Sequence, residues 1–84
     1  MYTVGQSKQV DEQIAALPAE ALAPFLEATV FLQVAPWNGN PFVRERPDAP
    51  MRTHTFGEGG AGMITYLIVE YRRLVEIIQV VWHG

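Results

Sequence analysis

The sequence contains no cysteine and only one serine among its 84 residues. The lack of cysteine excludes disulfides, thiolate nucleophiles and cysteine-based zinc sites, and is typical of a cytoplasmic protein. The serine, Ser7, precedes a helical pattern and fits a helix cap better than a catalytic nucleophile. The chain also has no run of about eighteen apolar residues and no basic N-terminus followed by an apolar stretch. We therefore expect neither a membrane span nor a secretion signal.

Positive charge is scarce as well, since the formal net charge is −3. This balance argues against the broad positive field of a protein that binds nucleic acid mainly through phosphates. Five of the six basic residues nevertheless lie in the second half: Arg44, Arg46, Arg52, Arg72 and Arg73. The first three could converge and bind phosphate in the bidentate way that guanidinium permits. Alternatively, Arg44 and Arg46 pair with Glu45 and Asp48 in a solvated loop.

The first half of the sequence predicts a strand followed by a helical hairpin. Residues 1–6 contain strand-forming residue types, and from Ser7 the apolar residues recur at helical spacing until Pro18. A second helix is predicted over residues 19–34, with this stripe facing a sheet: Leu22, Phe25, Leu26, Thr29, Val30 and Gln33. Pro24 suits this helix if its regular part begins near Ala21; otherwise a kink follows.

The second half predicts turns and three strands. Residues 35–41 and 47–50 are rich in turn formers, and strands are predicted over 51–56, 63–69 and 74–82. In the strand over 51–56, Arg52 and His54 share a basic face. The order predicts a single α+β domain over residues 1–84, with an N-terminal strand, a helical hairpin and an antiparallel sheet of three or four strands. Both helices are expected on one face of the sheet.

The last two strands are apolar on both faces. Side chains alternate along a strand, so one face of the last strand is predicted to carry Val75, Ile77 and Val81, and the other Leu74, Ile78, Val80 and Trp82. A two-layer domain of this size covers only one face of its sheet. We therefore expect a partner polypeptide to cover the other face.

Two further patterns in the sequence bear on its chemistry. Residues 57–62 match the spacing of a dinucleotide-binding glycine motif, but a strand pattern follows instead of a helix, so we interpret them as a connection and expect no cofactor. His54 and His83 are the only histidines, and no neighbouring spacing supports a metal site. Either imidazole suits acid–base chemistry near neutral pH, while a structural or exposed position is the alternative.

Three segments carry a resemblance to a known family. They are the early strand at residues 2–4, the hairpin Ala16-Leu17-Pro18-Ala19-Glu20, and the closing strands at residues 66–70 and 78–83. Together with the order of elements, they resemble the RelE/ParE superfamily of bacterial toxins, over nearly the whole chain. The resemblance implies a cytoplasmic toxin paired with a cognate antitoxin of a type II toxin–antitoxin system, and, as in RelE, cleavage of messenger RNA on the ribosome.

The resemblance also assigns roles to residues. It implies that Arg52 is a phosphate-binding arginine, with Arg44 and Arg46 beside it, and that His83 occupies the place of a catalytic histidine or tyrosine. His54 and Tyr66 are expected to face the same cleft. Active nucleases of the family typically carry an arginine in the third strand, whereas residues 63–69 contain no basic residue. A gyrase inhibitor similar to ParE, and a non-enzymatic interaction domain that forms a homodimer, are therefore kept as alternatives.

Overall fold

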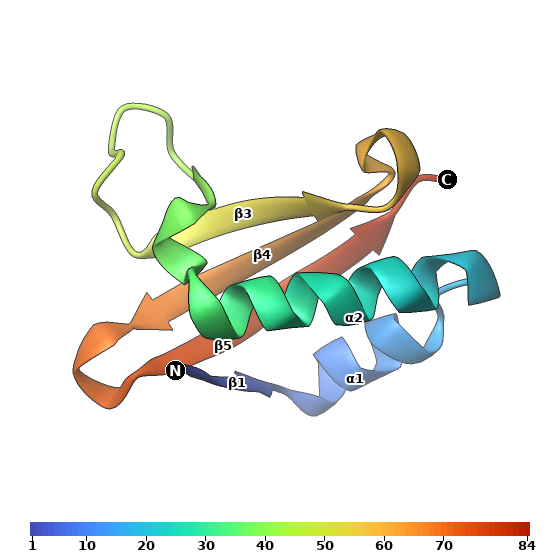
Figure 1. The fold of residues 1–84 in the computed structure, drawn as a ribbon, viewed down its shortest axis with the longest axis horizontal. Helices are drawn as coiled ribbons and strands as arrows, with labels where there is room; N and C mark the ends of the chain where they lie inside the picture. Colours follow the sequence, from blue (N-terminus) through green and yellow to red (C-terminus); the bar gives the residue numbers. More distant parts are fainter.

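The computed structural model describes residues 1–84 and confirms the α+β class (Figure 1). Its helices and strands follow in the order β1 (Thr3–Gln6), α1 (Lys8–Ala15), α2 (Ala19–Val34), β2 (Asn40–Pro41), β3 (Met51–Phe56), β4 (Gly62–Val69) and β5 (Leu74–Trp82). The strands form one sheet in the order β1-β5-β4-β3-β2, and the two helices lie on the same face of it. Neither helix combines the length and apolar content that a membrane crossing requires.

The sheet is larger and more mixed than the sequence predicted. Strands β3, β4 and β5 are antiparallel neighbours, as expected, but β1 pairs in parallel with β5 through the register Val4↔Val75. A fifth strand, β2, consists of two residues and pairs with β3. The parallel pairing of β1 was not predicted, because residue types indicate a strand but not its direction relative to the neighbouring strand. The strand β2 was not predicted either, because a two-residue strand containing proline has the composition of a turn.

Helix α2 has the predicted bounds, whereas α1 begins after Ser7 as predicted but ends at Ala15, two residues before Leu17. Ser7 caps α1, and its hydroxyl accepts a hydrogen bond of 3.3 Å from the Val10 N–H. Helix α2 begins at Ala19 and not near Ala21, so Pro24 lies beyond the first turn, inside the helix. Proline cannot donate to the carbonyl four residues earlier, which belongs to the exposed Glu20, where water can bind it instead.

The predicted sheet-facing stripe of α2 is correct for Phe25 and wrong for its other large apolar residues. The residues that face the sheet are Ala21, Phe25, Ala28 and Leu32, whereas Leu22, Leu26 and Val30 keep 46%, 63% and 56% of their surface exposed. Because α2 is apolar almost all round, its periodicity does not select one face. The small side chains of Ala21 and Ala28 allow this face to approach the sheet closely, which the larger residues of the predicted stripe would prevent.

The predicted facing of β5 is also wrong after Ile77. Thr65 pairs with Gln79 and the next residue, Tyr66, pairs with Ile77, so Ile78 is left without a partner. This β-bulge reverses the alternation, because one extra residue shifts all that follow to the other face. As a result, Val80 lies in the core with Val75 and Ile77, and Trp82 packs against it.

The hydrophobic core lies between the helices and the sheet. Its twelve buried members are Val10, Ala21, Phe25, Ala28, Leu32, Phe56, Ile64, Tyr66, Ile68, Val75, Ile77 and Val80. On the opposite side of the sheet, Met63, Leu67, Leu74 and Val81 are half-buried. The helices thus cover one face only. Among the large apolar side chains of the α-helices and strands, the most exposed ones lie on the outer side of α2.

Candidate functional site

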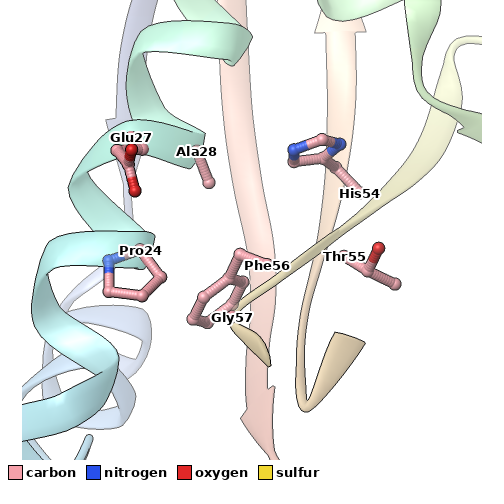
Figure 2. Close-up of a pocket in the computed structure, with 7 residues that line it drawn as sticks. All are labelled: Pro24, Glu27, Ala28, His54, Thr55, Phe56 and Gly57. Carbon is pink, nitrogen blue, oxygen red and sulfur yellow. The ribbon is translucent and has the colours of Figure 1, made fainter. Parts of the chain in front are cut away.

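His54 lines a cavity of about 230 Å³ between α2 and β3 (Figure 2). Its ring points towards the helix and stacks on Phe31, with ring centroids 3.9 Å apart and an interplanar angle of 11°. Glu27 reaches the same cavity from the helix side, whereas Thr55 points the other way. Burial lowers the pKa of the imidazole below its ordinary value of 6.5, which favours the neutral form. In that form His54 can accept a proton near neutral pH.

Arg52 lies inside the fold, where its guanidinium binds backbone carbonyls. Only 6% of its surface is exposed. Nη1 donates to the carbonyls of Pro47 and Ala49 at 2.9 and 3.1 Å, and Nη2 donates to that of Gly39 at 2.8 Å. The guanidinium carbon also lies 5.6 Å from the centroid of the Trp37 ring. The side chain predicted to bind phosphate therefore links Gly39, the residue before β2, to the end of the segment that connects β2 to β3.

Tyr66 is fully buried beside Arg52, its partner across β3 and β4. Its hydroxyl donates a hydrogen bond of 2.6 Å to the Pro36 carbonyl. Burial raises the pKa of this hydroxyl to about 12, although the charge of Arg52 opposes the rise. The phenol therefore keeps its proton at neutral pH and closes the core beneath the 3-10 turn Pro36–Asn38.

Arg44 and Arg46 are exposed on the connection between β2 and β3. Neither pairs with Glu45 or Asp48, since the only ion pair in the structure joins Arg73 to Glu70 at 3.4 Å. The ion-paired loop considered from the sequence is therefore absent. Arg46 lines a separate hollow of about 400 Å³ together with Glu45, Pro47, Asp48 and Ala49.

His83 lies at the opposite end of the sheet from Arg52. It follows the last residue of β5, and its backbone N–H donates to the Ala61 carbonyl at 2.8 Å. Its side chain is exposed and lines none of the three cavities. The predicted site residues thus occupy three places: the β2–β3 connection with Arg52 and Tyr66, the cavity of His54, and the C-terminus.

One polar cluster was not foreseen. Oε1 of Glu70 accepts hydrogen bonds from the Tyr2 hydroxyl at 2.6 Å and from Nε1 of Trp37 at 2.8 Å. Both bonds lower the pKa of Glu70, and the bond from Tyr2 has the larger effect. The same bond raises the pKa of the Tyr2 hydroxyl. The cluster joins the N-terminus, the turn after α2 and the β4–β5 connection. Its members are 33 and 68 positions from Glu70, so no local spacing reveals it.

The sequence matches no family model and no curated protein. Solved structures, in contrast, match its fold. The isolated RelE toxin of E. coli aligns over 100% of this chain and 86% of its own, with a TM-score of 0.80 and 9% identity. A RelE–RelB complex from Pyrococcus horikoshii aligns over 99% and 96%, with a TM-score of 0.66 and 21% identity. A toxin–antitoxin complex of the RelBE type from Mycobacterium tuberculosis aligns over 96% and 90%, with a TM-score of 0.62 and 23% identity. The chain therefore has the fold of the RelE toxins, as its resemblance to that superfamily predicted.

Proposed function

We propose that this chain is the toxin component of a bacterial type II toxin–antitoxin module, acting in the cytoplasm and restrained by a cognate antitoxin. The observation that carries the proposal is the alignment of the whole chain with the isolated RelE toxin at a TM-score of 0.80. Four of the similar structures are complexes of a RelE-type toxin with its antitoxin or an antitoxin peptide. A partner protein is thus a recurrent feature of this fold.

For the activity, we propose that any cleavage of ribosome-bound messenger RNA depends on His83 for proton transfer and on Arg44 and Arg46 for binding phosphates elsewhere along the RNA, because the two arginines lie at the opposite end of the sheet from His83. These three side chains are exposed, so they are free to meet phosphate or to move a proton. His54 is half-buried and burial lowers its pKa, which favours the neutral form, but it shares its cavity with the carboxylate of Glu27. In this proposal Arg52 and Tyr66 shape the β2–β3 connection that carries the two arginines.

A second candidate is a toxin-fold protein that binds its partner without cleaving RNA. Two observations favour it. Both Nη atoms of Arg52 and the hydroxyl of Tyr66 donate to carbonyls within the fold. The remaining predicted residues also fail to converge on one cavity. Catalysis of RNA cleavage requires the proton-moving group and the phosphate ligands to meet around one phosphodiester.

The test is controlled expression of the chain in a bacterium, with growth and messenger RNA integrity followed together. Growth arrest with RNA cleavage, abolished by His83→Ala or by Arg44→Ala with Arg46→Ala, supports the nuclease. Arg72→Ala is the matched control, because Arg72 is exposed on the β4–β5 connection. Arrest with intact RNA directs attention to a target such as gyrase. Unimpaired growth at good soluble yield contradicts the toxin proposal.

A further inference from the structure

The outer side of α2 is an apolar face that no other part of the chain covers. Leu22, Leu26, Val30 and Val34 follow one another at intervals of four residues, and each keeps between 46% and 63% of its surface exposed. We call these four residues the α2 stripe. In Figure 1 helix α2 lies across the front of the sheet, with α1 beside its first half. Such a continuous exposed stripe is unusual on a helix of a soluble protein and typical of an interaction surface.

The edge of α2 next to β3 is negatively charged. Glu20 and Glu27 are seven residues apart, so about two helical turns place them on the same side of the helix. Glu27 lines the cavity of His54, and Glu20 lines a neighbouring cavity of about 560 Å³ that also includes Glu58 and Trp82. Neither Lys nor Arg lines either cavity, and none of these glutamates forms an ion pair. The apolar stripe therefore runs beside an uncompensated acidic edge.

From this combination we infer that the α2 stripe binds an amphipathic helix of the antitoxin whose polar edge carries lysine or arginine. The identity of the partner as an antitoxin rests on the proposed function. Its apolar face and its basic edge are inferred from the residues of α2. A row of side chains at intervals of four packs into the grooves of a second helix, with a crossing angle near −50°. From Leu22 to Val34 the stripe is about 18 Å long, which corresponds to about twelve residues of the partner helix.

A second copy of this chain does not fit the same surface. Helix α2 contains no lysine and no arginine, so two stripes packed together would bring glutamates into the interface without any counter-charge. An anionic membrane surface is disfavoured for the same reason, because Glu20 and Glu27 would approach negative headgroups. A basic partner helix instead brings the opposite charge to the acidic edge and apolar side chains to the stripe.

The first experiment measures peptide binding to the purified full-length chain by calorimetry. The probe is a leucine–lysine peptide of about 16 residues with leucine at helical spacing, and the comparison peptide carries glutamate in place of lysine. We expect the lysine peptide to bind at least about tenfold more tightly. Leu26→Ser with Val30→Ser should weaken its binding by about tenfold or more, whereas Ile78→Ser, at an exposed position on β5, should not.

Charge reversal separates this inference from non-specific adhesion of a cationic peptide. Glu20→Lys with Glu27→Lys should reverse the preference between the two peptides. Glu12→Lys with Glu45→Lys changes the net charge by the same amount on other exposed positions and should leave the preference unchanged. Equal binding of both peptides, or an equal response to the two charge reversals, overturns the inference. Circular dichroism of each variant establishes that its fold is intact.

A second experiment distinguishes this inference from the proposed function. The chain is expressed together with the protein encoded beside it, and neutralisation of growth arrest is scored. Leu26→Ser with Val30→Ser should keep the arrest but lose its neutralisation. Arrest that is still neutralised overturns the inference and leaves the toxin proposal intact. Absence of arrest contradicts the toxin proposal, and the peptide measurements then decide on the binding surface alone.

Discussion

Arg52 and Leu26 differ in burial in the opposite sense to the one that their residue types suggest. The arginine is 6% exposed and its guanidinium binds three carbonyls, whereas the leucine is 63% exposed on the outer side of a helix. Burying a charge is costly unless hydrogen bonds satisfy it, and exposing a large apolar side chain gains nothing for an isolated fold. The comparison indicates that Arg52 stabilises the fold, whereas the exposure of Leu26 agrees with the association that we infer for α2.

The largest expected effect compares two leucines of the same helix. Leu32→Ala should lower the free energy of unfolding by about 3 kcal/mol, because the side chain is fully buried and its removal leaves a cavity. Leu26→Ala should change it by about 0.5 kcal/mol or less, because that side chain faces solvent. Urea unfolding of both variants measures the difference. Similar losses for the two would show that Leu26 is buried in the isolated protein.

Arg52→Ala should have the next largest effect, a loss of about 3 kcal/mol. The substitution leaves the carbonyls of Gly39, Pro47 and Ala49 without their donors in a partly buried setting. Urea unfolding measures this loss as well, and Arg72→Ala, at an exposed position, serves as the control with an expected change of about 0.5 kcal/mol or less. A stable Arg52→Ala variant would instead favour the phosphate-binding role predicted from the sequence.

Gly39→Ala should cost about 2 kcal/mol through overpacking. A Cβ at this position would collide with the Tyr66 hydroxyl and would lie 2.8 Å from the Thr53 carbonyl oxygen. The double variant with Tyr66→Phe should lose less than the sum of the two single variants, because removal of the hydroxyl relieves part of the collision. Additive losses in this double-mutant cycle would contradict the steric explanation.

The same regions show which features of the fold could be predicted from the sequence. Local spacing and local residue types predicted the start of α1 with its Ser7 cap, the bounds of α2 and the antiparallel β3–β4–β5 unit. The face of α2 that packs on the sheet was not predicted, because the helix is apolar nearly all round and only tertiary packing selects the side lined by Ala21 and Ala28. The bulge at Ile78 depends on a pairing register that one strand cannot reveal.

The candidate site was harder to predict than the fold. Arg52, His54 and Tyr66 have residue types that suit catalysis, but their roles depend on contacts with segments 13 to 30 positions away. The stacking of His54 on Phe31 and the approach of Glu27 join a strand to a helix across the core. A single sequence carries no signal for such distant contacts, whereas the topology brings them together directly.

The smallest expected effect concerns the pH dependence of stability, and it arises from His54. Burial lowers the pKa of this imidazole in the folded chain, so below pH 6.5 the unfolded chain takes up the proton more readily. Its contribution is therefore fully present above pH 6.5 and is lost progressively as the pH falls from 6.5 to the folded-state pKa. His54→Phe keeps an aromatic ring against Phe31 but cannot be protonated, so its unfolding midpoint should change less between about pH 7.5 and about pH 5. His83→Phe, at the exposed C-terminal position, should retain the dependence of the native chain. If His83→Phe removed the pH dependence instead, the proton taken up on unfolding would bind to His83. The cavity of His54 beside α2 would then have no part in the response to acid.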